Sequence, residues 1–290
     1  MMRKTLSILF VFALLCAAVT VSAQELTHDR DGNPISIPEQ VHSIISLAPA
    51  ITQVLLDLGM EKALVAVDTY SAQMFELEGI VSMDMMAPDI ELIVAISPDV
   101  IIASNMTLVN DRDALSYLAG LGCPVAVIPS SDSIDGIIAD VQFIGAIVGK
   151  AEESEALIQP LKDLIEQLIA NVDHPATVYF EIGSTPSLYS FGSGTFLHEM
   201  IEIAGGQNIF AAQNGWLAVS EEAVVAAAPD VIFTNETWVD NPVAQILQRP
   251  GWESVPAVTN GKVFYIDDNA SSQPNHHIVD ALVAIAEALR

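Results

Sequence analysis

The chain has 290 residues, of which 37 are Asp or Glu and 10 are Lys or Arg, so its formal net charge at pH 7 is −27. This acidity argues against a nucleic-acid-binding protein and against docking on anionic lipid, because both need clustered Lys and Arg. We interpret the charge as the solvated surface of an exported protein; the alternative is a surface that attracts cations or cationic partners.

The first 23 residues have the layout of a secretory signal peptide. Two basic residues precede an apolar run at 6–18, and a small-residue cleavage site ends at Ala23. The apolar run is too short for a transmembrane helix. We therefore predict an exported protein, in the periplasm or on the outer face of the cytoplasmic membrane. Cleavage after Ala23 is favoured over a lipid anchor at Cys16.

Apolar strands and helices alternate after a polar N-terminal extension at 24–41. Strands are expected at 43–47, 63–67, 100–103 and 125–128, and helices at 51–58, 88–96 and 112–121, with a loop at 68–72. The strands lack polar alternation, which is typical of parallel strands covered on both faces. We predict an N-terminal α/β lobe over residues 42–132.

The middle of the chain, residues 133–172, has its longest helical pattern, with apolar residues at helical spacing. A long helix at this place predicts a stiff connector between two lobes. Pro160 inside it would remove a backbone hydrogen bond at a cost of roughly 3 kcal/mol, so we expect a kink or break there.

Residues 173–290 repeat the α/β scheme and form the predicted C-terminal lobe. A strand at 177–182 is followed by a polar loop at 183–194 and a helix at 195–204, and a later strand at 263–266 by a loop at 267–274 and a helix at 276–289. The fold class is therefore α/β, with two lobes of parallel-type sheets flanked by helices, a long central helix, and a ligand cleft between the lobes.

Two segments of similar sequence support this division. ELIVAISPDVII at 91–102 and EAVVAAAPDVIF at 222–233 each have a Glu, six mostly apolar residues, Pro-Asp and an apolar run. The separation is too wide for a solenoid repeat. It indicates two similar lobes, each with a helix, a Pro-Asp turn and a buried strand.

The order and spacing of several short pieces resemble the substrate-binding proteins of iron-chelate and vitamin B12 ABC transporters. The pieces are IISLAPA at 44–50, PDVII at 98–102, GTFLHEMI at 194–201, GGQNIF at 205–210, PDVIF at 229–233, RPGW at 249–252 and GKVFY at 261–265. The resemblance implies two α/β lobes that hold a small-molecule metal chelate at their interface. It also implies delivery of that ligand to a membrane permease and its ATPase.

The resemblance assigns roles to residues at matched positions. Glu91 and Glu222 fall where the vitamin B12-binding members present one Glu per lobe to arginines of the permease. Tyr70 and Trp216 match aromatic contacts to the corrinoid, and Asp267 matches a polar contact at the cleft.

Further ligand-binding candidates follow from the rule that α/β sheets bind ligands at the carboxyl ends of their strands. These candidates are Asn105, Ser184, Thr185, Tyr189, Trp238, Asn269, Ser271 and Ser272. His276 is a further candidate, as an axial or polar contact to a chelated metal. Trp216 stands in the segment Asn-Gly-Trp, for which we predict a loop in place of core packing.

The ligand itself stays open between an iron-siderophore, haem and a corrinoid. Methionines at 82–87 replace a ligand-facing Trp of the vitamin B12 binders, and methionine surfaces adapt to varied shapes. This departure weakens the case for a corrinoid and leaves an iron chelate or haem open. Arginines are scarce, which disfavours strongly anionic chelates. We expect no intrinsic cofactor, no catalytic residue and a monomer.

Two alternatives remain. His276 and His277, adjacent at a predicted helix start, suit either a single contact to a chelated metal or part of a bare transition-metal site. An exported α/β hydrolase is the other alternative, although the chain has no Gly-x-Ser-x-Gly, phosphate-loop or dinucleotide motif.

Overall fold

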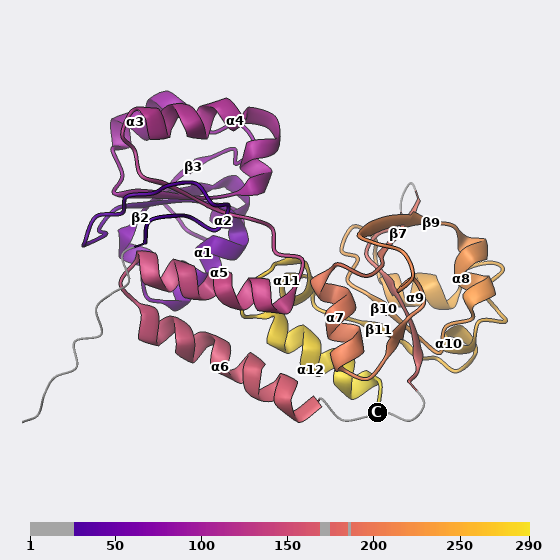
Figure 1. Ribbon diagram of the computed structural model, residues 1–290. Helices are drawn as coiled ribbons and strands as arrows, with labels where there is room; N and C mark the ends of the chain where they lie inside the picture. The colour runs from indigo at the N-terminus through magenta and orange to yellow at the C-terminus, as the bar shows by residue number, and fades with distance from the viewer. Residues whose placement is uncertain (1–25, 169–174, 185–186) are drawn as a thin grey trace, which may run out of the picture.

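The computed structural model describes residues 26–168, 175–184 and 187–290, which form two α/β lobes joined by helices, as predicted (Figure 1). The predicted signal peptide at 1–23, with Cys16 and Ala23, lies outside these residues, as do residues 169–172 of the predicted connector and the candidate Thr185. Within the described ranges, no helix combines the length and the apolar character needed to cross a bilayer.

A parallel five-stranded sheet of order β3-β2-β1-β4-β5 forms the centre of the N-lobe. Its strands are β1 (Ile44–Leu47), β2 (Leu64–Asp68), β3 (Val81–Met83), β4 (Val100–Ser104) and β5 (Val125–Ile128). The helical segments of this lobe are α1 (Pro49–Asp57), η1 (Glu61–Ala63), α2 (Thr69–Met74), α3 (Ile90–Ile96) and α4 (Asn105–Gly120).

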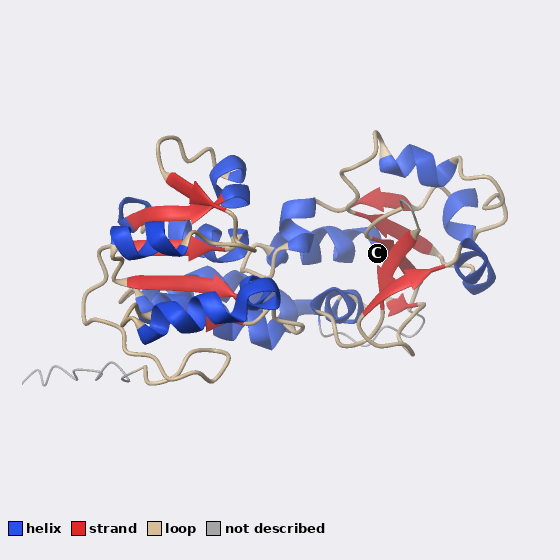
Figure 2. Cartoon of the chain, turned by 90° about the horizontal axis from the view of Figure 1, so that it is seen from above, coloured by secondary structure: helices blue, strands red, loops and turns tan. Residues whose placement is uncertain are grey.

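The central strand β1 is buried along its whole length because side chains pack on both faces of the sheet. Ile44 belongs to the apolar cluster shared with α1, and Ile45 to the cluster on the opposite face. In Figure 2 the arrowheads of the N-lobe strands point toward the C-lobe. The carboxyl ends of these strands, where α/β sheets bind ligands, therefore face the other lobe.

The C-lobe has a parallel sheet of order β11-β10-β6-β8 and an antiparallel ribbon of β7 and β9. Its strands are β6 (Thr177–Glu181), β7 (Leu188–Phe191), β8 (Gln207–Asn208), β9 (Trp216–Val219), β10 (Val231–Thr234) and β11 (Val263–Tyr265). Its helices are α7 (Phe196–Ile203), α8 (Glu221–Ala227), α9 (Pro242–Leu247), α10 (Pro256–Thr259), α11 (Asp268–Ser272) and α12 (Ile278–Ala288).

The connector consists of two helices, α5 (Ile134–Ile147) and α6 (Ala151–Leu168), of which α6 is the long one. Each helix contributes to both cores: Ile144 and Ile158 are buried in an N-lobe cluster, and Ile137 and Leu161 in a C-lobe cluster. Because the same two helices are packed into both lobes, this arrangement favours the predicted stiff connection.

The predicted single helix over 133–172 is thus wrong in its middle. The chain turns back between α5 and α6 at Gly149, whose φ of +68° suits glycine. The predicted break at Pro160 does not occur, since α6 runs through this residue. Pro160 is exposed, so it interrupts no buried packing.

The two similar sequence segments have the same structure. The helices α3 and α8 both end in a residue with a left-handed backbone, Ser97 and Ala228. The Pro-Asp turns follow, and Asp99 accepts hydrogen bonds from the backbone N–H groups of His42 and Ser43. In the C-lobe, Asp230 accepts a hydrogen bond from the backbone N–H group of Thr177. Each aspartate therefore ties the start of one strand to the start of its neighbour.

The short elements of the fold were not predictable from the sequence pattern. The strand β3 and the strands of the ribbon were not predicted. The predicted loop at 68–72 overlaps α2, and the predicted loop at 267–274 contains α11. These segments have at most six residues, which is too short for a period of 2 or 3.6 to stand out.

Candidate functional site

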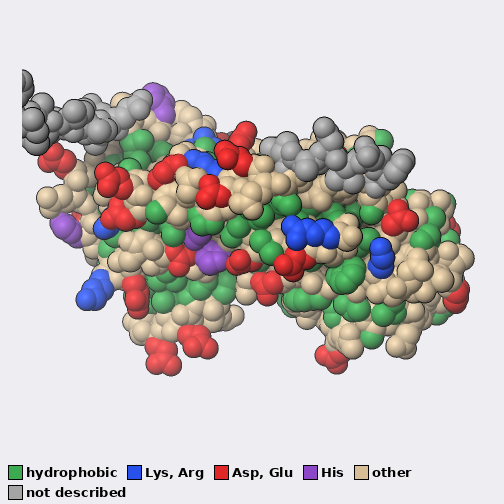
Figure 3. Space-filling model, turned by 90° about the horizontal axis from the view of Figure 1, so that it is seen from below, with side chains coloured by type: hydrophobic (Ala, Val, Ile, Leu, Met, Phe, Trp, Pro, Cys, Tyr) green, Lys and Arg blue, Asp and Glu red, His purple; other side chains and the backbone are tan. Residues whose placement is uncertain are grey.

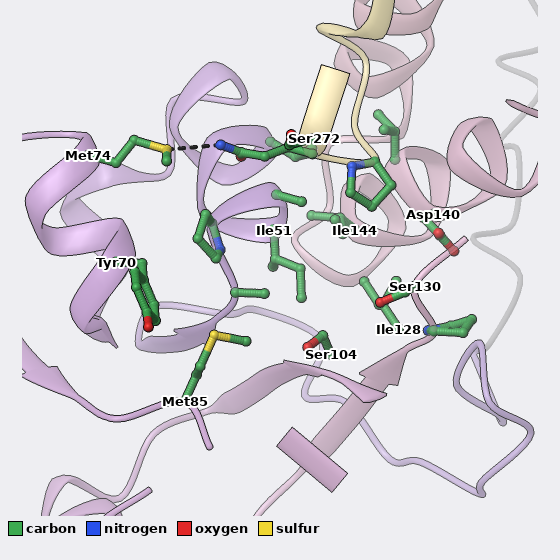
Figure 4. Close-up of a pocket in the computed structure, with 18 of the residues that line it drawn as sticks. Ile51, Tyr70, Met74, Met85, Ser104, Ile128, Ser130, Asp140, Ile144 and Ser272 are labelled. Carbon is green, nitrogen blue, oxygen red and sulfur yellow. Dashed lines mark hydrogen bonds between the residues drawn. The ribbon is translucent and has the colours of Figure 1, made fainter. Parts of the chain in front are cut away.

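A cavity of about 400 Å³ lies where the N-lobe meets α5 and the α11 segment of the C-lobe (Figure 4). The side chains that line it are mainly apolar. They include Ile51, Val54, Met74, Met85, Met86, Ile128, Val141 and Ile144, together with Tyr70, Ser104, Ser130, Asp140, Asp268 and Ser272. The site is therefore an apolar pocket with a few polar groups, the usual composition of a small-molecule site.

The strands of the N-lobe place these residues at one edge. Ala48 follows β1 with an extended backbone, and Pro49 opens α1 at its first turn, where the missing N–H costs nothing. Ser104 ends β4 and Ile128 ends β5. Parallel strands end at the same edge of the sheet, so the residues that follow them converge on the cavity.

Two polar side chains of the cavity have unusual environments. The hydroxyl of Ser104 is buried and has no hydrogen-bond partner within the described structure, which leaves it free for a ligand group. Asp140 accepts a hydrogen bond from Arg30 Nε at 2.7 Å and another from the Ser131 hydroxyl. Burial nevertheless raises the pKa of Asp140 above its ordinary value.

A second cavity of about 290 Å³ adjoins the first on the other side of a contact between the lobes. Met74 and Gln273 line both cavities, and Gln273 Nε2 lies 2.9 Å from Met74 Sδ. The second cavity is more polar, with Asp267, Asn269 and His277 in its wall.

The predicted N-lobe and α11 candidates lie at or near these cavities. Tyr70 and Ser272 line the first cavity, and Tyr70 is 62% exposed at its edge. Asp267 and Asn269 line the second, and the Asp267 carboxylate also caps α11 by accepting the Ala270 N–H.

Asn105 and Ser271 serve the structure around the cavities. The Asn105 side-chain oxygen accepts hydrogen bonds from the N–H and hydroxyl of Ser130, a residue of the first cavity. Ser271 is buried and receives a hydrogen bond from Asn235 Nδ2. Neither residue lines a cavity itself, so each can act on a ligand only by positioning its neighbours or after the lobes move.

The predicted C-lobe candidates Ser184, Tyr189, Trp216 and Trp238 line neither cavity. Trp238 is 92% exposed, Trp216 60% and Tyr189 41%, so the C-lobe presents large aromatic side chains to solvent. Trp216 does not lie in a loop as predicted: it begins β9 and packs edge-on against Phe191, with ring centroids 6.0 Å apart.

His276 is buried outside the first cavity. Its Nε2 atom lies 3.1 Å from Asp57 Oδ2, and His277 Nε2 lies 2.9 Å from the same oxygen. Burial, reinforced by the neighbouring His277, lowers the pKa of His276 to about 4, so its imidazole is neutral at pH 7. These three side chains are a candidate set of metal ligands.

Several residues of the cavity wall were not among the predicted candidates. Ser104 and Ser130 follow two correctly predicted strands, so the strand-end rule could have found them. Asp140 belongs to a connector helix, and no local pattern marked it as a wall of the site.

A comparison with known families decides the class of this protein. A family model described as periplasmic binding protein matches residues 44–270, and the chain belongs to that family. Members are solute-binding proteins, which agrees with the prediction that the chain is not an enzyme and removes the hydrolase alternative.

Similar proteins extend over most of the chain. An uncharacterised ABC transporter substrate-binding lipoprotein of Bacillus subtilis strain 168 is 24% identical over 269 residues, covering 90% of this chain and 84% of the relative. A cobalamin-binding protein of Halobacterium salinarum is 26% identical over 274 residues, covering 90% and 72%.

Solved structures share the two-lobed fold. The periplasmic vitamin B12-binding protein of Vibrio cholerae matches with a TM-score of 0.69 and 25% identity, covering 87% of this chain and 98% of that one. A periplasmic haem-binding protein from Roseiflexus sp. RS-1 matches with a TM-score of 0.70 and 23% identity, covering 86% and 100%. One fold thus accommodates different ligands, and the ligand must be argued from the site.

Proposed function

We propose that this protein captures a corrinoid of the vitamin B12 type outside the cytoplasm and delivers it to the permease of an ABC importer. The observation that carries the proposal is the apolar cavity at the carboxyl ends of the N-lobe strands, whose described lining includes no Lys or Arg. Relatives described as cobalamin-binding and vitamin B12-binding, which match over 90% and 87% of this chain, support it.

The shape of the site suits a ligand larger than the cavity. A volume of about 400 Å³ accommodates one side of a macrocyclic chelate, held against Tyr70 and the methionines. The exposed aromatic side chains of the C-lobe, Trp216 and Trp238 among them, offer a second flat surface for the rest. A site open on one side therefore takes a bulky ligand without enclosing it.

The charges of the site favour a corrinoid over haem and over acidic siderophores. The described residues that line the cavity include Asp140 and Asp268 but no Lys or Arg. Arg30 and Arg249 are already paired with Asp140 and Glu181. Haem propionates or catecholate groups would therefore find no unpaired Lys or Arg in the described lining of the cavity, whereas the amide side chains of a corrinoid need only hydrogen bonds.

Bare metal ions as transported ligands are the second candidate. The observation in its favour is the Asp57, His276 and His277 cluster. Its histidines are absent from the wall of the first cavity, however, and His277 alone lines the second. We therefore place the transported ligand in the first cavity and treat the cluster separately.

The permease contacts follow from the repeated architecture. Glu91 lies in the first turn of α3 and Glu222 in the first turn of α8, and both are exposed. The two helices lie on different lobes, away from α6 (Figure 1). One carboxylate on each lobe suits a pair of cationic sockets on a two-fold symmetric permease, which would fix the orientation of docking.

The test is a titration of the protein with cyanocobalamin, haem and a neutral ferric hydroxamate siderophore, followed by calorimetry. We expect cyanocobalamin to bind with micromolar or higher affinity and the other two at least tenfold more weakly. Ala50 lines the cavity, so Ala50→Trp should fill it and abolish binding without removing a core side chain. The control Ala146→Trp lies on the exposed side of α5 and should bind normally. Preference for haem or the siderophore would reject the corrinoid, and binding by Ala50→Trp would reject the cavity.

A further inference from the structure

A group of metal-ligating side chains joins the two lobes away from the proposed ligand cavity. Asp57 is the last residue of α1 in the N-lobe, whereas His276 and His277 lie in the C-lobe between α11 and α12. His276 is 7% exposed, and the side chains of Asp57 and His277 are 30% and 41% exposed. The group is therefore partly shielded but open to an ion from solvent.

The distances within the group match the dimensions of a small ion's coordination shell. His276 Nε2 and His277 Nε2 lie 3.1 Å and 2.9 Å from Asp57 Oδ2, and one ligand atom from each residue lies within 4.8 Å of the others. In a tetrahedral site with bonds of about 2.0–2.1 Å, neighbouring ligand atoms stand roughly 3.3 Å apart. Small side-chain shifts would bring all three atoms onto one ion.

We propose that Asp57, His276 and His277 bind a divalent transition-metal ion of the Zn²⁺ type. Two imidazoles and one carboxylate suit Zn²⁺, Co²⁺ or Ni²⁺ and not Mg²⁺ or Ca²⁺, which prefer oxygen ligands. Water would complete the shell.

The surroundings support this assignment. His277 Nδ1 lies 3.8 Å from Asp280 Oδ2, so a carboxylate stands on the far side of the imidazole, as it commonly does for metal-bound histidines. Gln53 Nε2 donates to Asp57 Oδ2 at 2.9 Å and holds the carboxylate in place. Acidic side chains are spread over both lobes of the face seen in Figure 3, and the strongly acidic chain raises the concentration of cations near the protein.

The position of the site gives the ion a structural role. An ion held by Asp57 and the histidines links the end of α1 to the start of α12, and so links the lobes. The opposite end of α1, at Pro49 to Ile51, lines the first cavity. The ion is thus a bound component that fixes the lobes beside the cavity and is not the transported ligand, and it does not depend on what that ligand is.

The experiment is a Zn²⁺ titration of the untagged, chelator-treated protein, with Co²⁺ as a spectroscopic probe of coordination. We expect one ion per chain with micromolar or higher affinity, tetrahedral Co²⁺ absorption bands, and a rise in Tm on adding Zn²⁺. His277→Gln and Asp57→Asn should each weaken binding at least thirtyfold and remove the rise in Tm. His42→Gln, which changes an exposed histidine outside the group, should behave like the unmodified protein.

The outcomes separate this site from the transported ligand. Equal Zn²⁺ affinity in His277→Gln and the unmodified protein, or fewer than one ion per chain, would overturn the proposal. Amide hydrogen exchange in residues 49–57 and 278–288 should slow on adding Zn²⁺, and unchanged exchange would overturn the link between the lobes. Cyanocobalamin titrations of the same variants report on the proposed function, because Zn²⁺ binding is measured without that ligand.

Discussion

The cores of the two lobes use different side chains on the same backbone plan. Between residues 42 and 132 the aromatic residues are Tyr70, Phe75 and Tyr117, and none of them is buried. The C-lobe, in contrast, buries Tyr179, Phe180, Phe191, Phe196, Phe210, Phe233 and Trp252. The connector adds one buried aromatic residue, Phe143, to the N-lobe core. Strand pairing and the Pro-Asp turns therefore do not dictate the core composition, since a mainly aliphatic core and an aromatic-rich core both satisfy them.

The difference extends to the ends of the strands. In the N-lobe the strand ends open onto the apolar cavity. In the C-lobe, Glu181 at the end of β6 is buried and paired with Arg249 through two hydrogen bonds of 2.7 and 2.8 Å. Arg249 also stacks over Trp252 at 4.4 Å. One lobe thus keeps space for a ligand, whereas the other fills the corresponding region with a charge pair and rings.

The largest expected effect concerns a feature that both lobes share, the exposed glutamate in the first turn of α3 and of α8. Replacing both Glu91 and Glu222 by Lys should abolish stimulation of the transporter ATPase, because a cationic permease socket would then meet a like charge in each lobe. Each single reversal should give a partial loss. The assay is ATP hydrolysis by the reconstituted transporter.

Ligand affinity of this double variant should be unchanged. The matched control reverses Glu61 and Glu202, one exposed glutamate per lobe, and should stimulate normally. Normal stimulation by the Glu91 and Glu222 variant would mean that these residues are ordinary surface glutamates.

The next effect concerns the charge pair of the C-lobe. Arg249→Ala leaves the Glu181 carboxylate buried without a partner and should lower the free energy of unfolding by about 3–5 kcal/mol. Replacing both residues, as in Glu181→Gln with Arg249→Met, removes the charges together and should recover much of this loss. Urea denaturation of the unmodified protein, Arg249→Ala and the double variant measures the free energy of unfolding. An equal loss of stability in the double variant would contradict the explanation by an unpaired charge.

Sequence alone predicted the parts of the fold that repeat a strong pattern. The strands β1, β4, β5 and β6 are continuous apolar runs, and the Pro-Asp segments fix their neighbours, so fold class and lobe order could be inferred. The turn at Gly149 could not, because helical spacing continues on both sides of it.

The wall of the cavity was harder to predict than the fold. Tyr70 and Ser272 were among the candidates, but Asp140 comes from the connector and Met74 contacts a residue distant in sequence, Gln273. Such contacts depend on how the lobes dock, and no local periodicity encodes that arrangement.

A third, smaller effect is the loss of ligand affinity when an aromatic side chain at the cavity is removed, in comparison with removal of an aromatic side chain elsewhere in the same lobe. Tyr70→Ala should weaken ligand binding by ~1–3 kcal/mol, the scale of a lost aromatic contact and its buried area. Stability should hardly change because Tyr70 is 62% exposed. Tyr117→Ala is the control, being 60% exposed and outside the cavity wall. Calorimetry measures the ligand affinity of each variant, and thermal unfolding measures its Tm. If Tyr70→Ala mainly lowers Tm and leaves the ligand affinity unchanged, Tyr70 is not a residue of the site.

The smallest effect is a pH dependence in the N-lobe, where a carboxyl is buried without a cation. Asp68 is fully buried, caps α2 by accepting the Ser71 N–H, and also bonds the Ser71 hydroxyl. Burial outweighs these hydrogen bonds and raises the pKa of Asp68 above 3.8. The folded protein therefore holds this proton at pH values where the unfolded chain has released it.

The sign of the dependence follows from linkage. The stabilisation from a protonated Asp68 is fully present below the pKa of the unfolded chain, near 3.8, and is lost as the pH rises through the raised pKa of the folded state. Asp68→Asn keeps a capping oxygen but cannot titrate. The free energy of unfolding of the unmodified protein minus that of Asp68→Asn should therefore decrease as the pH rises from 3.5 and level off toward neutrality. Urea denaturation of both proteins across this range measures it, and a difference that grows with pH would show that hydrogen bonding, not burial, dominates at Asp68.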